Sequence, residues 1–179
     1  KGAFAPQPAL MQHHPEVGMV YGHADDVADT LPVIDTTARS WSTWSGARWL
    51  DLTAARALNP VYTPSVVMRR DAWRAIEEYD GRVPHASDML LWFQTALDWQ
   101  IGRVNNRAQA FYRRHGANMH LTRFAGMLRD LGEQREVLRI LFDEPVTGTR
   151  PPERLRVAAH RPLMRRPPPL PLDPRRRRR

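Results

Sequence analysis

The sequence predicts an α/β fold, because apolar strand patterns alternate with amphipathic helix patterns along residues 1–149. The clearest strand pattern is the apolar run VGMVY at residues 17–21, which Gly22 ends. The clearest helix pattern covers residues 88–99, where apolar side chains recur at helical spacing. Only about three strands are expected, fewer than a complete doubly wound sheet needs, so we predict a partial domain.

The remaining elements are expected from local patterns. Residues 23–47 are polar and are predicted to form a loop. Asp51 is expected to cap a short helix that ends at Leu58. The β-branched run at residues 61–68 predicts a strand, which Pro64 places at a sheet edge or a bend. We further expect a helix at 71–79, a loop at 81–86, a helix cap at Ser87, a strand at 108–112 and a helix at 121–142.

The C-terminal residues 150–179 differ in composition from the preceding part of the chain. They contain 11 arginines, 2 acidic residues and 8 of the 16 prolines, whereas residues 1–149 contain 16 basic and 17 acidic residues. The net charge of +8 therefore comes from the tail. Because proline removes backbone donors and like charges repel, we expect a disordered tail with polyproline II character at residues 167–171. A short helix at residues 153–160 is an alternative for its first part.

The composition also excludes several classes of protein. The chain has no cysteine, which excludes disulfides and thiolate metal sites. No apolar run approaches the roughly 18 residues of a membrane helix. The first residues, KGAFAPQPALMQHHPE, lack the basic segment and apolar region of a signal peptide. We therefore expect a cytoplasmic protein without a transmembrane segment.

Four segments contain the motifs that point to a function. In chain order they are HPEVGMVYG at residues 14–22, NPVYTPSVVMRRDAW at 59–73, YDGRVPHASDMLLWFQTA at 79–96 and FYRRHGANMH at 111–120. Their order and spacing resemble the C-terminal, acceptor-side half of the family 2 glycosyltransferases, over about residues 15–142. The resemblance implies that residues 1–149 are part of a GT-A-like domain, which binds nucleotide-diphospho-sugars, and that the tail follows it.

The resemblance also implies a reaction, the inverting transfer of a sugar from a nucleotide-sugar donor to a hydroxyl acceptor. A hydroxyl is a poor nucleophile at neutral pH, so a carboxylate must accept its proton. Asp88 occupies the position of the family's base, in a first helical turn where the helix dipole favours a negative charge. Ser87 stands where the family has Glu, and Leu90 where it often has a second Asp. The alternative is that Asp88 is an ordinary aspartate of a first helical turn.

Two further groups of residues are assigned by the resemblance. The group expected to line the acceptor site comprises Thr63, Ser65 and Ser87. The group expected to contact the diphosphate or a metal comprises Arg113, Arg114 and His115, because guanidinium groups pair with phosphate and imidazole binds divalent cations. The alternatives are ordinary strand residues for the first group and an exposed polar turn for the second.

The metal chemistry of the family is not visible in this chain. The resemblance implies Mg²⁺ or Mn²⁺ held by a D-x-D motif, and no D-x-D occurs in the sequence. Four possible metal ligands near the N-terminus match no recognised ligand spacing and are interpreted as surface groups. They are His13, His14, His23 and Asp25. The metal ligands are therefore left unassigned. We expect the donor-binding half to lie outside this chain and the isolated chain to be inactive.

Two other functions compete with the transferase. Arginine runs neutralise phosphates, so residues 150–179 could bind a nucleic acid or another anionic surface. The second alternative is a degenerate, non-catalytic relative of the family that serves in protein contacts. The presence of Ser87 in place of the family's Glu favours this alternative. The tryptophans of WSTWSGARW, Trp41, Trp44 and Trp49, are interpreted as packing residues, with a sugar-stacking platform as the alternative.

Overall fold

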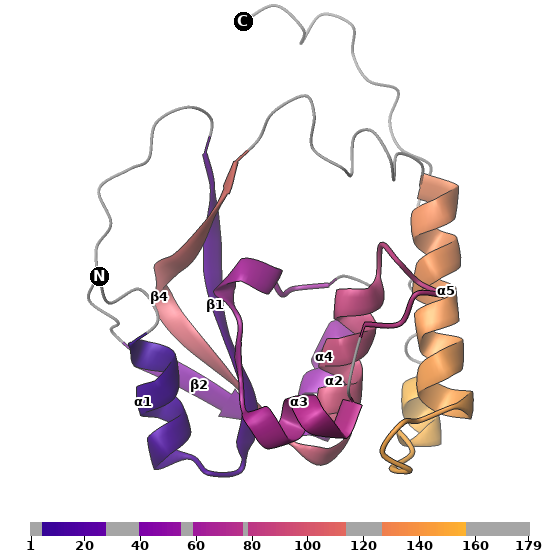
Figure 1. Cartoon of the computed structure of the whole chain (residues 1–179), viewed down its shortest axis with the longest axis horizontal. Helices are drawn as coiled ribbons and strands as arrows, with labels where there is room; N and C mark the ends of the chain where they lie inside the picture. The colour runs from indigo at the N-terminus through magenta and orange to yellow at the C-terminus, as the bar shows by residue number, and fades with distance from the viewer. Residues whose placement is uncertain (1–4, 28–39, 55–58, 77–78, 114–126, 157–179) are drawn as a thin grey trace, which may run out of the picture.

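A four-stranded sheet forms the centre of the computed structural model, in the order β2-β4-β1-β3 (Figure 1). β1 (Val17–Val27) and β4 (Gln100–Arg113) pair in parallel. β2 (Ser40–Trp44) pairs antiparallel with β4, and the short β3 (Val67–Met68) pairs antiparallel with β1. The α/β class is therefore confirmed, with a mixed sheet. The structure describes residues 5–27, 40–54, 59–76, 79–113 and 127–156.

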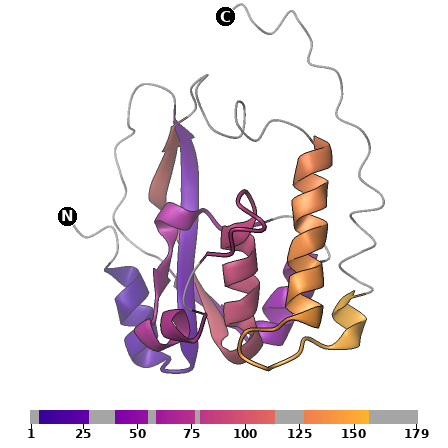
Figure 2. The same ribbon diagram turned by 45° about the vertical axis from the view of Figure 1, so that its right-hand side comes forward.

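Helices cover both faces of this sheet (Figures 1 and 2). On one face, α1 (Pro6–His13) buries Leu10 against the sheet. On the other face, the core is built around α4 (Ser87–Asp98). It is completed by α2 (Gly46–Ala54), α3 (Arg70–Ile76) and α5 (Met127–Asp143).

The side chains of β1 divide between the two faces. Met19 and Tyr21 join the large core around α4, whereas Val17 and Val20 join the small core beneath α1. Strict alternation would place Val17 and Met19 on the same face. The register of β1 against β4 shifts between these two residues, and this irregularity turns Val17 to the opposite side.

The predicted helix at residues 88–99 is confirmed as α4. The side chains of Leu91, Trp92, Thr95 and Ala96, which the sequence places on one face, are all buried. The burial continues around the helix, since every residue from 89 to 96 is buried. A helix that is apolar on most of its surface belongs inside a core, and α4 packs against α2, α3, α5 and β1.

The loop predicted for residues 23–47 is wrong in part. β1 continues through the polar residues HADDV to Val27, because that stretch pairs with residues 108–113 of β4. β2 forms at the other edge of β4, and residues 28–39 lie outside the described residues. Parallel pairing with a partner far away in sequence thus outweighs local polarity.

The predicted helix start at Asp51 is also wrong. α2 begins at Gly46, and the Ser45 hydroxyl accepts a hydrogen bond from the Arg48 amide at 3.3 Å, as a cap residue does. Trp49 is buried in the large core, which confirms a packing role, whereas Trp41 on edge strand β2 is exposed.

Residues 61–68 do not form one strand. They contain a 3₁₀ turn, η1 (Thr63–Ser65), followed by the two-residue strand β3 at a sheet edge, as Pro64 indicates. The helix predicted for 71–79 is α3, which ends at Ile76, and the strand predicted for 108–112 is part of the longer β4. The helix predicted for 121–142 is α5 within its described part; residues 121–126 lie outside the described residues.

The predicted cap at Ser87 is wrong. Ser87 is the first residue of α4, and the N-cap position is occupied by Ala86, which makes no side-chain cap hydrogen bond. An alanine cannot accept a hydrogen bond through its side chain, so the start of α4 has no capping side chain at its own N-cap position.

The folded body extends beyond residue 149, into the predicted tail that begins at residue 150. Residues 153–156 form a helical turn, and Leu155 is buried in the large core. The Arg156 guanidinium lies 4.5 Å from the ring centre of Phe142 and donates a hydrogen bond to Asp143 at 2.9 Å. Residues 157–179 lie outside the described residues, so the nucleic-acid alternative stays a prediction. Within the described part, no helix is long and apolar enough to cross a membrane.

The start of α2 gives a test of this packing. A Cβ atom at Gly46 would lie 1.7 Å from the carbonyl oxygen of Ala96 in α4. Because the backbone of α2 or of α4 would have to move to relieve this clash, Gly46→Ala is expected to lower the free energy of unfolding by about 1–3 kcal/mol or more. The matched control is Gly132→Ala in α5, where the new methyl group meets nothing within 4 Å. This control should stabilise the protein by about 0.5–1 kcal/mol. Urea unfolding measures both, and equal stability of the two variants would contradict the α2–α4 contact.

Candidate functional site

Asp88 lies in the first turn of α4, at the end of the helix that points toward the carboxyl ends of β1 and β4 (Figure 1). This location follows from the connection: α4 runs against the strand direction and leads directly into β4 at Gln100. Ligands of open α/β sheets bind outside the carboxyl ends of the parallel strands. Asp88 is half-buried at this position.

Both oxygens of this carboxylate accept hydrogen bonds from another segment of the chain. Asn59 donates through Nδ2 to Oδ1 at 3.2 Å, and the Thr63 hydroxyl donates to Oδ2 at 3.0 Å. The amide of Met89 also donates to Oδ1, at 2.6 Å. Each carboxylate oxygen has two lone pairs, so Oδ2 retains the capacity to accept a further hydrogen bond from a hydroxyl.

The two donor side chains are themselves held in place. The Oδ1 atom of Asn59 accepts a hydrogen bond from the amide of Val61 at 3.1 Å, which fixes the plane of the side-chain amide. Thr63 is exposed and begins η1, the turn that ends at the fully buried Ser65. The Ser65 hydroxyl accepts a hydrogen bond from the Gly22 amide at 3.3 Å and lies 3.2 Å from the Gly22 carbonyl. Ser65 thereby anchors η1 to β1.

Two exposed aromatic side chains lie close to Asp88 or its partners. Tyr62 immediately precedes Thr63, and its ring centre is 5.9 Å from that of Tyr112 in β4. Tyr79 contacts Trp73 edge-on with ring centres 6.0 Å apart. Partial burial raises the pKa of Tyr79, and the negative charge of Asp88 raises it further. Tyr79 therefore lies within the electrostatic reach of Asp88.

The structure brings together only some of the residues that the sequence assigns to the site. Thr63 and Asp88 are hydrogen-bonded to each other, and Ser87 lies beside Asp88 in the first turn of α4. Ser65 is fully buried and its hydroxyl faces the backbone of β1 rather than solvent. Of the three residues predicted to contact the diphosphate or a metal, Arg113 is exposed at the end of β4. Arg114 and His115 lie outside the described residues.

Sequence reasoning missed Asn59 as a site residue. The signal for Asn59 is its position at the start of the segment at residues 59–73, where an asparagine before a proline favours a turn. Tyr62 and Tyr79 were missed as well. No sequence pattern separates an exposed tyrosine beside a site from one packed in a core.

Divalent cations bind to clusters of carboxylate and imidazole groups. Within the described part of the chain, no three histidine, aspartate or glutamate side chains stand close enough to hold a metal ion. His23 pairs with Asp25 at 3.0 Å on the surface, which agrees with the interpretation of these residues as surface groups. The partners of Asp88, an amide NH₂ and a hydroxyl, point hydrogen atoms at the carboxylate.

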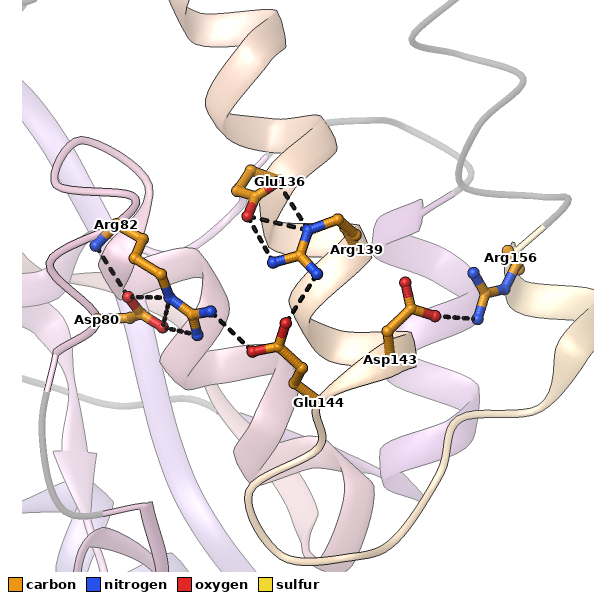
Figure 3. A network of polar contacts seen from close by, with 7 residues as sticks. All are labelled: Asp80, Arg82, Glu136, Arg139, Asp143, Glu144 and Arg156. Carbon is orange, nitrogen blue, oxygen red and sulfur yellow. Dashed lines mark hydrogen bonds and ion pairs between the residues drawn. The ribbon is translucent and has the colours of Figure 1, made fainter.

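An ion-pair network joins the loop before α4 to the end of α5 (Figure 3). Arg82 pairs with Asp80 at 2.6 Å and with Glu144 at 2.7 Å. Arg139 pairs with Glu144 at 2.7 Å and with Glu136 at 2.8 Å. The hydrogen bond from Arg82 lowers the pKa of Asp80, and those from Arg82 and Arg139 lower the pKa of Glu144. The network thus links the loop that carries Tyr79 to α5.

Comparison of the chain with protein-family models, with curated proteins and with solved structures finds no match. The function must therefore be argued from the geometry around Asp88. The hypothesis to compare with this geometry is the one predicted from the four sequence segments, in which Asp88 accepts a proton from a hydroxyl group.

The ion-pair network makes stability depend on pH. Asp80 and Glu144 have lowered pKa values in the folded protein, so the stability they contribute is present above their ordinary values, near pH 4. It is lost as the pH falls through the lowered values. Arg82→Gln should therefore lower the melting temperature at neutral pH, and the difference from wild type should vanish in acid.

Circular-dichroism melts across pH 2–7 measure this difference. The matched control is Arg135→Gln on the exposed surface of α5, which should leave the pH profile unchanged. Because Arg82 and Glu144 are exposed, added salt should also reduce the effect of Arg82→Gln. A difference that is independent of pH would contradict a network held by these carboxylates.

Proposed function

We propose that this chain is the acceptor-side part of a family 2, GT-A-type inverting glycosyltransferase, in which Asp88 is the catalytic base. The observation that carries the proposal is the pair of hydrogen bonds from Asn59 and Thr63 to the two oxygens of Asp88. All three residues come from the segments that resemble the family. They converge at the end of α4 that points toward the carboxyl ends of β1 and β4, the side on which open α/β sheets bind their ligands.

These partners distinguish Asp88 from an ordinary first-turn aspartate. Such a residue is stabilised by the helix dipole and by amides of its own helix, and it needs no other partner. Asp88 does bond the amide of Met89, but it also receives two side-chain donors from 25 and 29 residues earlier in the chain. Orientation by a second element is typical of a general base, whose carboxylate must point at one reacting proton.

The proposed reaction uses Asp88 as a proton acceptor. The acceptor hydroxyl donates a hydrogen bond to the carboxylate while its oxygen attacks the anomeric carbon of the donor sugar. The bond from that carbon to the diphosphate breaks on the opposite face, and the hydroxyl proton passes to Asp88. Asn59 and Thr63 keep the carboxylate oriented as the proton arrives.

The proposal also covers the binding of the donor. The nucleotide and a divalent cation would be held mainly by residues outside this chain. Arg113, Arg114 and His115 are proposed to approach the diphosphate from the end of β4. The exposed rings of Tyr62 and Tyr79 favour a saccharide acceptor, because tyrosine offers a flat apolar face beside a polar hydroxyl group.

The proposal is tested by Asp88→Asn in a longer protein that contains this chain and the donor-binding half. Asparagine keeps the size and the hydrogen-bonding oxygen of the side chain but cannot accept the proton. Turnover should fall by about 10²–10⁴-fold, the usual contribution of a general base, while the KM for the nucleotide sugar stays unchanged. Initial-rate kinetics with both substrates measure the two quantities.

The matched control is Asp71→Asn. Asp71 is also an aspartate in the first turn of a helix, α3, and it is exposed. This substitution should leave turnover within about twofold of wild type, because it changes only a surface charge. If Asp88→Asn also retained turnover within that range, Asp88 would not be the base.

A further inference from the structure

We infer that Glu133 of α5 is a positioning residue that holds the first turn of α4, and with it Asp88. The carboxylate oxygen Oε2 of Glu133 accepts hydrogen bonds from two consecutive backbone amides, those of His85 at 2.7 Å and Ala86 at 3.1 Å. These amides immediately precede α4. The catalytic consequence of this contact rests on the function proposed above, whereas the contact itself does not.

Glu133 acts where the sequence of α4 provides no cap of its own. The N-cap residue Ala86 has no side-chain acceptor, and its amide also donates a hydrogen bond within the preceding turn, to the Val83 carbonyl at 3.0 Å. A carboxylate beside the start of a helix also interacts favourably with the helix dipole. A side chain 47 residues later in the sequence thus takes the place of a local cap.

Glu133 lies on α5, a helix that packs into the large core. Val137, Leu138 and Leu141, on the turns that follow, are buried in the large core together with the residues of α4. The later turns of α4 are fixed by the same core. Ala86, Met89 and Leu90 at its start are buried in this core as well, and Asp88 follows Ala86 by two residues. A displacement of His85 and Ala86 therefore moves the Asp88 carboxylate relative to Asn59 and Thr63.

This contact differs in kind from the neighbouring ion pairs. Arg82 and Glu144 join the same loop to α5 through two exposed side chains, which salt screens. Glu133 is half-buried and bonds the backbone, so it fixes the path of the chain. The position of Asp88 should therefore depend on Glu133 and hardly on the Arg82–Glu144 pair.

The experiment compares Glu133→Ala with Glu133→Gln and with the control Glu136→Ala. Glutamine keeps a side-chain oxygen that can accept both hydrogen bonds. Glu136 lies one turn later on α5 and pairs only with the side chain of Arg139 among the interactions of this network. Circular dichroism and thermal melts establish that each variant is folded before the comparison is made.

Two readouts are measured. Amide hydrogen exchange in the chain itself should be about tenfold faster at residues 85 and 86 in Glu133→Ala, and unchanged in Glu136→Ala. In the longer protein with its donor-binding half, Glu133→Ala should lower kcat by about 10- to 100-fold at an unchanged KM for the nucleotide sugar. Glu133→Gln should restore most of both effects.

The outcomes separate this inference from the proposed function. If Asp88→Asn abolishes turnover but Glu133→Ala leaves kcat intact, the positioning role is wrong and Asp88 still stands as the base. Unchanged exchange at residues 85 and 86 would overturn the inference at the level of the contact. If Asp88→Asn retains turnover, the proposed function fails together with the predicted change in kcat, whereas hydrogen exchange still decides whether Glu133 holds residues 85 and 86.

Discussion

The site depends on the hydrogen bond that one buried hydroxyl, that of Ser65, accepts from the backbone amide of Gly22 in β1. The ladder between β1 and β4 changes register at this point, between Tyr21 and His23. Such irregularities leave backbone groups without a ladder partner, and buried backbone groups need one. Ser65 supplies it. Residue 22 is a glycine because a Cβ atom there would lie 2.0 Å from Cγ of Gln109 on β4.

From this anchor the positions of the site residues follow in order. Ser65 fixes η1, and η1 presents Thr63 to Asp88 from the side of the sheet. On the opposite side, Glu133 of α5 bonds the turn that leads into α4. The Asp88 carboxylate is therefore placed by η1, which Ser65 holds to β1, and by α5, which packs into the large core. Preorganisation of this kind is what allows a carboxylate to meet a reacting hydroxyl in a productive geometry.

The sequence predicted the elements whose formation is dominated by burial. The helix at residues 88–99 was placed within one residue at each end, because its apolar pattern reflects a core on most sides. The resemblance assigned Thr63 and Asp88 to the acceptor side separately, and the hydrogen bond between them was not predicted. The polar second half of β1 and the edge strand β2 were not predicted, because both form by pairing with β4, a partner far away in sequence.

The features that the sequence could not provide are those that depend on which polar group is buried. Ser65 was expected to face the acceptor, yet its hydroxyl is turned into the fold. A serine in a strand-like segment looks the same in either orientation. Ser87 was expected to cap α4, whereas a carboxylate from α5 takes that place. No local pattern links Glu133 to residues 85 and 86, since the contact spans nearly 50 positions.

The central claim is that the Asp88 carboxylate, with Asn59 and Thr63, forms a site for a hydroxyl-bearing acceptor. An NMR titration of this chain with methyl pyranosides tests it most directly, because binding of an acceptor requires neither donor nor metal. The account predicts chemical-shift changes at the side-chain amide of Asn59 and at the backbone amides of residues 62–65 and 87–89. Shifts confined to a distant surface, such as that around Trp41, or no shifts at all with any pyranoside at millimolar concentration, would contradict it.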